Sequence, residues 1–493
     1  MAGRLIGSRQ PIDHGYDVVI VGAGIYGLAL AIHLRRLSPE ASVLVLEDGA
    51  VAESSITVNT SGIIRHSYAD PDVHTVSAYG MPFFKHPSRA LGLEGAISTF
   101  TPAGWARMLN DHEQPGSLAM ARDVVGVAAG LGLPGVELLT ADELLERTPP
   151  ARIANLRRCF SQRDYSHVLW EEDGGWADGS GTLRLFAEAA LQLGADIAVH
   201  ARASGFTRSG EKVTGVRVEG WQGGRTGAEN GLAEITVPAG RTVIAAGLWL
   251  RHLVRVATGL EMPVYPSFHQ IVVAHSSPGF PIDTEEVELD AGRTRRIAAL
   301  PVVSYWRDCY FRPEGGGVLI GLHQYELQHE LYQPTGGGLP DGSRIGLDQG
   351  MVDQLVHNLD HVPLLAEGSL RLGNSAQDLS GGFYVMNPEE LPLEGEVPGT
   401  EGSLLVLGSG CGTGFKLGPG VARLLAQRML GVPPEERLVA SAALSVERSR
   451  YFFPAGTTDE ELRRLFLPTN AGGRFRHVGA SGVSVAGAGP AVR

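Results

Sequence analysis

The feature that most constrains the fold is a glycine-rich turn between an apolar strand and a helix near the N-terminus. Residues 16–21 (YDVVIV) are β-branched and apolar on both faces, as in a strand buried between two helical layers. The run 22–27 (GAGIYG) follows at once with G-x-G-x-x-G spacing, and apolar residues then recur at helical spacing as far as Ser38. The sequence therefore predicts a Rossmann-type βαβ unit.

An acidic residue falls where such a unit uses one. A second apolar strand, 42–46, ends in Glu47, 20 residues after the last glycine of the turn. The glycines permit a tight turn, close approach to a pyrophosphate and close packing of helix on strand, while the acidic residue accepts from ribose hydroxyls. A glutamate disfavours a 2′-phosphate, so we expect FAD or NAD rather than NADP. The alternative is a purely structural glycine turn.

Charge and cysteine usage exclude several classes of partner. The 493 residues include 54 Asp and Glu against 41 Lys and Arg, a formal charge of −13, and they contain no Lys/Arg run. We therefore expect neither nucleic acid nor a membrane as a partner. Cys159, Cys309 and Cys411 are isolated, so we expect no disulfide framework and no metal site. We also expect a cytoplasmic location, because no signal peptide or spanning segment is apparent.

The rest of the chain predicts a second, different sheet. Residues 196–218 are rich in short strands, 242–246 form a further parallel strand, and 262–323 have an antiparallel pattern. Near the C-terminus, strand 403–407 leads into a glycine-rich turn and a helix over 417–430. We expect an α/β fold, a Rossmann-type FAD-binding domain with an inserted substrate domain built on a mostly antiparallel sheet. The predicted boundaries are 16–100, 171–258 and 395–453 for the FAD-binding domain, 101–170 and 259–394 for the substrate-binding domain, and 454–493 for a partly disordered C-terminal extension.

Together these segments resemble the D-amino acid oxidase family of flavoproteins, most closely its sarcosine oxidase and N-methyltryptophan oxidase branch. The resemblance spans roughly residues 16–453 and is carried by VVIVGAGIYGLALAIHL (18–34), GIIRHSY (62–68), YFRPEGGGVLIG (310–321) and GTGFK (412–416). It implies an FAD enzyme that oxidises the C–N bond of an amino acid or N-alkyl amino acid to an imine by hydride transfer to flavin.

The resemblance also implies a pair of substrate-binding cations. Arg65 and Lys416 match the residues that hold the substrate carboxylate in that branch. Arg offers a planar fork of donors and Lys a point charge, and a cation is unfavourable at a helix N-terminus unless it serves an anion. The alternative is that Arg65 pairs with an Asp and that Lys416 is simply a cation at a helix start.

Further site residues follow from the same resemblance. Tyr310 and His323 match residues that line the substrate pocket of that branch; otherwise Tyr310 is a core residue and His323 a histidine satisfied by backbone. The expected FAD-binding residues come from the glycine-rich turn, the loop after Glu47, the middle of the chain and the C-terminal turn: Gly22, Ala23, Gly24, Ile25, Tyr26, Gly27, Glu47, Asp48, Ser55, Asn59, Gly62, Ile63, Ala203, Ala246, Gly247, Gly412, Gly414, Phe415 and Lys416.

Two departures from the branch bear on its chemistry. The branch attaches FAD through a cysteine two residues before a tyrosine, and here Gly382 precedes Tyr384. A glycine cannot form the thioether, so we expect non-covalent FAD. Oxidases of the branch also carry a lysine credited with activating oxygen, and our alignment places Leu319 there.

Two other functions remain as alternatives. A flavin-dependent monooxygenase or halogenase also begins with G-x-G-x-x-G but usually has a Gly-Asp pair in its C-terminal third, where this chain has Gly408-Ser409-Gly410. A non-catalytic flavin-binding subunit needs the glycine turn but not Arg65 and Lys416. The partners expected of an enzyme are a small amine or amino acid and an electron acceptor, either oxygen or another compound.

Overall fold

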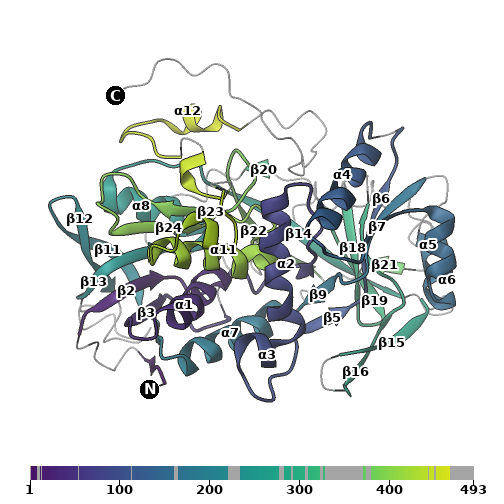
Figure 1. Cartoon of the computed structure of the whole chain (residues 1–493), viewed down its shortest axis with the longest axis horizontal. Helices are drawn as coiled ribbons and strands as arrows, with labels where there is room; N and C mark the ends of the chain where they lie inside the picture. Colours follow the sequence, from purple (N-terminus) through teal and green to yellow (C-terminus); the bar gives the residue numbers. More distant parts are fainter. Residues whose placement is uncertain are drawn as a thin grey trace.

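The computed structural model describes residues 2–7, 12, 14–53, 55–112, 114–159, 165–219, 234–276, 282–289, 292–305, 309–322, 326–327, 370–372, 379–441, 444–448 and 451–466. Two large sheets dominate this part of the chain, and helix α2 lies between them in the view of Figure 1.

The first sheet contains the predicted βαβ unit. Its strands run in the order β1-β10-β3-β2-β13-β12-β11, β24 also pairs with β13, and β23 pairs with β24. The pairs among β10, β3, β2, β13 and β24 are parallel. The strands are β1 (Leu5–Ile6), β2 (Tyr16–Val21), β3 (Val43–Glu47), β10 (Asp196–Val199), β11 (Arg202–Ser209), β12 (Lys212–Glu219), β13 (Ile235–Ile244), β23 (Leu393–Glu396) and β24 (Leu404–Gly408).

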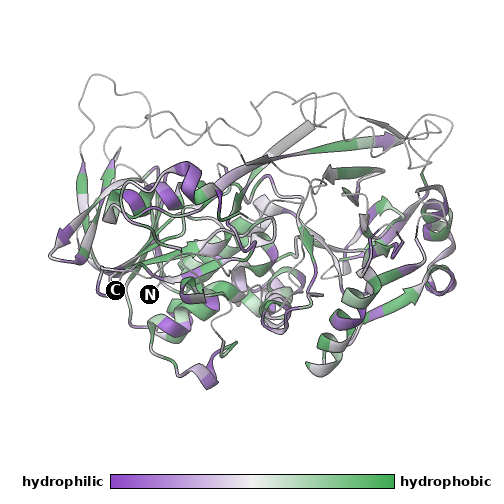
Figure 2. Cartoon of the chain, turned by 90° about the horizontal axis from the view of Figure 1, so that it is seen from above, coloured by the Kyte–Doolittle hydropathy of each residue, from purple (hydrophilic) through white to green (hydrophobic). Residues whose placement is uncertain are grey.

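Helices cover both faces of this sheet, as the apolar strand sequences predict. Val18 and Ile20 of β2 pack in the core beneath α1, α2, α7 and α11, whereas Val19 and Val21 pack in a second core with α8. Figure 2 shows apolar residues concentrated in the interior strands. The helices of this half are α1 (Ile25–Leu37), α2 (Pro71–Lys85), α3 (Pro87–Leu91), α7 (Gly179–Gln192), α8 (Leu250–Thr258), α11 (Gly414–Met429) and α12 (Asp459–Arg463), with 3-10 turns η1 (Gly247–Trp249), η4 (Pro434–Glu436) and η5 (Val446–Arg448).

The second sheet is mostly antiparallel. Its order is β20-β14-β19-β18-β17-β6-β8-β7, β21 and β22 also pair with β14, and among the pairings of the described strands only β6 with β17 is parallel. Helix α4 packs on one face, and α5 and α6 on the other. The elements are β6 (Trp105–Leu109), β7 (Val136–Thr140), β8 (His167–Glu171), β14 (Tyr265–Ser276), β17 (Val302–Tyr305), β18 (Cys309–Glu314), β19 (Gly317–Leu322), β20 (Glu326–Leu327), β21 (Leu370–Leu372), β22 (Leu379–Met386), α4 (Ser117–Gly130), α5 (Ala141–Arg147) and α6 (Pro150–Cys159).

Two smaller sheets complete the described elements. A three-stranded sheet joins β4 (Ile63–Ile64), β9 (Gly175–Ala177) and β5 (Phe100–Pro102), and a hairpin joins β15 (Thr284–Glu288) to β16 (Thr294–Ala298). The predicted fold class, an α/β fold with a Rossmann-type sheet and a mostly antiparallel second sheet, is confirmed. The domain boundaries stay a prediction.

Some local predictions differ from the structure. Within the predicted antiparallel stretch 262–323, residues 296–303 do not form one strand but divide between β16 and β17, because Pro301 has no N–H for a strand ladder. The C-terminal helix begins at Gly414 rather than Leu417, which places Lys416 in its first turn. In the predicted extension, residues 459–463 form α12, and the disorder expected beyond residue 466 lies outside the described residues. No helix in the described residues is long and apolar enough to cross a membrane.

Close packing of α2 on α11 gives a stability prediction. A Cβ at Gly420 would lie 2.3 Å from the Val76 carbonyl oxygen, so Gly420→Ala should destabilise the fold by about 1–3 kcal/mol through overpacking. Gly126 is exposed on α4 with no described atom within 4 Å of such a Cβ, and Gly126→Ala should stabilise by about 0.5–1 kcal/mol. Thermal unfolding at matched cofactor saturation measures both. A wild-type midpoint for Gly420→Ala would contradict the packing argument.

Candidate active site

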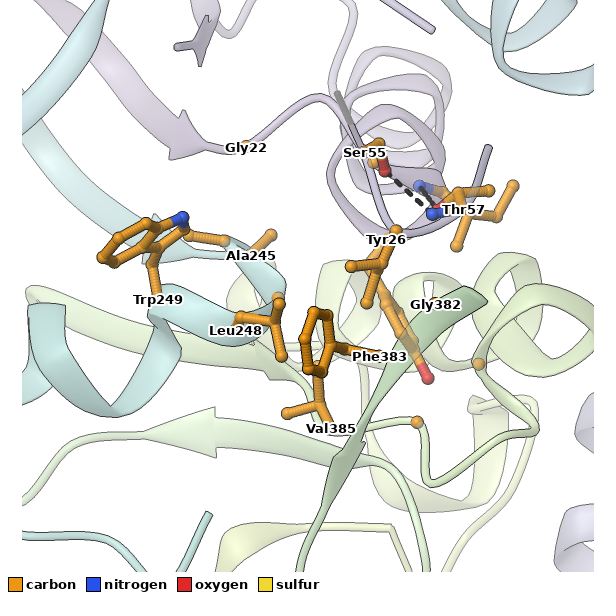
Figure 3. Close-up of a pocket in the computed structure, with 18 of the residues that line it drawn as sticks. Gly22, Tyr26, Ser55, Thr57, Ala245, Leu248, Trp249, Gly382, Phe383 and Val385 are labelled. Atoms are coloured by element: carbon orange, nitrogen blue, oxygen red, sulfur yellow. Dashed lines mark hydrogen bonds between the residues drawn. The ribbon is translucent and has the colours of Figure 1, made fainter. Parts of the chain in front are cut away.

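A cavity of about 840 Å³ lies where the carboxyl ends of the parallel strands meet the second sheet. The residues that follow β2, β3, β13 and β24 all line it, as expected for a ligand site in an open α/β sheet. Figure 3 shows Tyr26, Ser55 and Thr57 around the same space as Trp249 and Phe383. The volume is within the range of small-molecule and cofactor sites.

The glycine-rich turn forms one wall, and its glycines are required by close approach. A Cβ at Gly22, where φ is +110°, would lie 2.6 Å from the Ala245 carbonyl oxygen, and one at Gly27 would lie 1.9 Å from the Gly22 carbonyl oxygen. Gly24 lines the cavity, and a Cβ there would stand 3.3 Å from Ser55 Oγ. The turn therefore leaves room for a ligand beside its backbone, which fits the predicted pyrophosphate.

Glu47 is held against this turn by its backbone contacts. Its carboxylate accepts hydrogen bonds from the Ala23 N–H at 2.7 Å and from the Gly49 N–H at 3.3 Å. Burial raises the pKa of Glu47, and the backbone donors oppose that rise. At the same end of the cavity, Arg202 forms a bidentate ion pair with Asp48 at 2.9 and 3.1 Å.

The opposite wall contains a strained turn between β24 and α11. Ser409 and Cys411 adopt left-handed φ values of +52° and +45°, which side chains rarely tolerate. The buried Asn387 side chain holds this turn, because its amide donates to Ser409 Oγ at 2.8 Å and to the Leu391 carbonyl at 2.6 Å. The turn is thereby fixed in front of the cavity before any ligand binds.

Three rings from the second sheet close the cavity. Tyr384 on β22 stacks on His269 of β14 with ring centroids 3.7 Å apart, and its hydroxyl is hydrogen-bonded to that of Tyr310 on β18. Tyr310 also shares a hydrogen bond with Ser61, and burial raises its pKa. This wall joins the sheet to the loop that follows Glu47.

Arg65 is buried between aromatic faces and lacks a carboxylate partner in the described chain. It is 6% exposed, and its guanidinium carbon lies 4.2 Å from the ring centroid of Tyr68 and 4.6 Å from that of Trp105. Its Nη1 donates to the Ser67 carbonyl. A guanidinium has five N–H donors, so donors remain for an anion.

Lys416 is also buried, at 8% exposure, and it lies close enough to Arg65 for the two positive charges to interact. Within the described residues, no protein group forms a hydrogen bond or ion pair with its ammonium. Burial, followed by the positive charge of Arg65, lowers the pKa of Lys416 to about 7, whereas Glu171 acts in the raising direction. Two buried cations without a carboxylate ion pair in the described residues are a candidate anion site.

Leu319 lies on the same face of the second sheet as Tyr310 and Arg312. It pairs directly with Arg312, while Val318 and Ile320 pack in the core behind the strand. The Arg312 guanidinium donates to the Ser61 carbonyl at 2.7 Å, and it also forms an ion pair with Glu314.

The structure brings most of the predicted residues to one cavity. Arg65 and Lys416 do not line it, although Phe415, next to Lys416, does, and His323 lies outside the described residues. Ala23, Gly27, Gly62 and Ile63 are not part of the lining either. The predicted residues that line the cavity are Gly22, Gly24, Ile25, Tyr26, Glu47, Asp48, Ser55, Asn59, Ala203, Ala246, Gly247, Tyr310, Gly412, Gly414 and Phe415.

Sequence reasoning missed several lining residues, among them Arg202, Trp249, His252, His269 and Tyr384. Trp249 comes directly after residues 245–248 (AAGL), which follow the end of β13, so the end of that parallel strand could have indicated it. His269 lies on a strand with alternating faces, and only the pairing partners of that strand reveal which face meets the cavity.

Comparison with known proteins identifies this architecture. A family model described as "FAD dependent oxidoreductase" (DAO) matches residues 17–428. The chain is 25% identical over 324 residues to a 4-methylaminobutanoate oxidase (formaldehyde-forming) of Paenarthrobacter nicotinovorans, which covers 64% of this chain and 33% of that protein. It is 27% identical over 249 residues to sarcosine oxidase subunit beta of an Arthrobacter species, covering 50% of this chain and 55% of the relative. The matches thus span a third to about half of these relatives' length.

Solved structures share the fold at low identity. The L-proline dehydrogenase of P. horikoshii superposes with a TM-score of 0.63 at 18% identity, over 85% of this chain and 94% of that one. Glycine oxidase from Geobacillus kaustophilus superposes with a TM-score of 0.61 at 19% identity, over 89% and 99%.

The cavity wall at Gly382 gives a prediction about the cofactor. Gly382 lines the cavity without a thiol, so acid precipitation should release all FAD into the supernatant. Absorbance of the supernatant and of the redissolved pellet measures the partition. Flavin that stays in the pellet after washing in denaturant would contradict non-covalent binding.

Proposed function

The chain belongs to the DAO family of FAD-dependent oxidoreductases, and from this we propose that it oxidises the C–N bond of an amino acid or N-alkyl amino acid. The observation that supports the proposal is the pair of buried cations, Arg65 and Lys416, of which Lys416 directly follows the cavity-lining Phe415. A substrate carboxylate satisfies both, because Arg can bind two oxygens in a plane and Lys adds a point charge.

The residues that would hold FAD fit the cofactor. The open backbone at Gly24 suits the pyrophosphate, Glu47 suits the ribose, and the turn that contains Gly412 suits the ring system. The chemistry that FAD supplies when bound is removal of a hydride from the carbon next to the substrate nitrogen. Water then hydrolyses the imine product.

The protein's own contribution is binding and orientation. Arg65 is restrained by the rings of Tyr68 and Trp105, so its donors have a fixed direction before substrate arrives. Lys416 is fixed by the first turn of α11, next to the cavity-lining Phe415. A carboxylate held by both cations places the rest of the substrate at a defined position, and such positioning lowers the entropic cost of reaction.

The test is a screen for anaerobic bleaching of the bound flavin. Amino acids and N-methyl amino acids are compared with the matching amines that lack the carboxylate. We expect bleaching by at least one carboxylate compound and much slower bleaching by its decarboxylated partner. A non-catalytic flavin-binding subunit would be bleached by none of them, and equal rates for both members of a pair would contradict carboxylate recognition.

The cation pair predicts the behaviour of substitutions. Arg65→Ala or Lys416→Ala should weaken binding of a carboxylate inhibitor by about 10- to 150-fold, because a hydrogen bond to a charged group contributes about 1.5–3 kcal/mol. FAD content should not change.

In the wild type, affinity for the inhibitor should be full below the Lys416 pKa of about 7 and fall as pH rises through it, because only the ammonium attracts the anion. Titration of the flavin spectrum measures both effects.

Lys416→Arg is the matched control, since its charge persists across this pH range. It should bind the inhibitor with little change between pH 6 and 9. If Arg65→Ala and Lys416→Ala both bind like the wild type, the site does not hold the carboxylate.

Leu319 predicts the response to oxygen. An ammonium near the reacting centre would stabilise negative charge that develops on oxygen, and an apolar leucine does not. Unless Lys416 or His323 supplies this charge instead, the substrate-reduced enzyme should be reoxidised slowly by air and turn over faster with an artificial acceptor dye. Leu319→Lys should then raise the oxygen rate. Stopped-flow mixing with oxygenated buffer measures this, with Leu319→Met as the apolar control. Fast reoxidation of the unmodified protein with no gain in Leu319→Lys would refute the assignment.

A further inference from the structure

A carboxylate that is sealed from solvent lies behind Arg65. Glu171, the last residue of β8, is 0% exposed. Its two oxygens accept hydrogen bonds from the backbone N–H groups of His66 and Ser67, each at 2.9 Å. The His66 ring nitrogen Nε2 lies 3.6 Å from the same carboxylate. Glu171 therefore fixes, through hydrogen bonds, the backbone of the two residues that follow Arg65.

The strand neighbour of Glu171 holds the Arg65 side chain. Trp105 on β6 pairs directly with Glu171, and its indole is one of the two rings that enclose the guanidinium. The indole N–H donates to Ser304 Oγ at 3.1 Å on the neighbouring strand β17, which fixes the ring. Two adjacent positions of the second sheet thus restrain one loop, Glu171 through its backbone and Trp105 through its side chain.

The charge of Glu171 also matters to the cation pair. The positive charge of Arg65 disfavours the Lys416 ammonium, and the negative charge of Glu171 favours it. Lys416 also lies in the first turn of α11, where the positive end of the helix dipole disfavours a cation. A buried carboxylate is costly unless it is hydrogen-bonded and near positive charge, and Glu171 has both. Without Glu171, the two buried cations would lose a negative charge that offsets their repulsion.

We propose that Glu171 is a positioning residue for the cation pair: it fixes the Arg65 loop against the second sheet and supplies the negative charge that permits two cations to be buried together. This proposal rests on the proposed function, because the pair is taken to bind the substrate carboxylate. Glu171 does not touch the cavity and acts through Arg65 and Lys416.

The first test is Glu171→Gln in the full-length, FAD-loaded protein, with benzoate and acetate as probes. The amide keeps the shape of the side chain but turns an N–H₂ group toward one of the two backbone donors. We expect unchanged FAD content and a rise in the dissociation constant of roughly tenfold or more, as for the loss of a hydrogen bond to a charged group. Glu172→Gln, in the exposed turn next to it, is the matched control and should bind like the wild type.

The second readout separates a charge effect from a packing effect. The charged groups acting on Lys416 are Arg65 and Glu171, with His66 and His74 hydrogen-bonded to each other behind Glu171. Loss of the negative charge lowers the pKa of Lys416 further, so the pH at which carboxylate affinity falls should move downward in Glu171→Gln. A purely structural defect would weaken binding without moving that midpoint.

A third pair of variants keeps the proposal testable if Glu171→Gln does not fold. Glu171→Asp retains the charge on a shorter side chain, so affinity should fall while the pH midpoint stays. Trp105→Leu removes the ring but no charge and should do the same. Wild-type affinity in Glu171→Gln, or in both Glu171→Asp and Trp105→Leu, overturns the positioning role.

The outcomes also distinguish this inference from the proposed function. If Arg65→Ala and Lys416→Ala weaken the binding of benzoate and Glu171→Gln does not, only the role of Glu171 fails. If none of the three substitutions changes binding, the carboxylate site itself fails.

Discussion

Burying two positive charges in the same region of the protein costs free energy, and several neighbouring groups offset that cost. Arg65 and Lys416 are each less than a tenth exposed, and the helix that carries Lys416 presents its positive end to them. The cost is offset by two aromatic faces on Arg65 and by one sealed carboxylate, Glu171. The remaining imbalance is positive, which supports the proposal that this pair binds a carboxylate.

The two sheets contribute differently to the site. The parallel strands of the first sheet end at the cavity, where the turn after β2 and the strained turn after β24 line it. Such main-chain turns suit a large cofactor that is held along its length. The second sheet contributes side chains: Tyr310 and His269 line the cavity, and Trp105 packs on the guanidinium of Arg65. In the proposed function, the backbone turns of the first sheet would therefore hold the cofactor, and side chains of the second sheet would lie next to the substrate.

How far the sequence predicts this site depends on the range of the contacts. The turn 22–27 is predictable because its glycines are needed for local reasons, and the Glu47 contact with it spans one βαβ unit. Arg65 and Lys416 were placed through resemblance to a family, and their proximity is a property of the folded chain. Glu171 could not be found in this way: it is an ordinary glutamate at the end of a strand until the pairing with Trp105 sets it behind Arg65.

The order in which the first sheet is assembled affects how the chain is made. The last three residues of β13, 242–244, pair with β24, yet β24 begins about 160 residues after β13 ends. At synthesis rates of about 5–20 residues per second, the ribosome needs roughly 8 to 32 s to make the residues between β13 and β24. During this time that edge of β13 has no partner strand. Throughout this interval an apolar strand edge and the bare face of α1 are open to other nascent chains. Recombinant yield should therefore respond to chaperone supply and to lower growth temperature more than the stability of the finished fold would suggest.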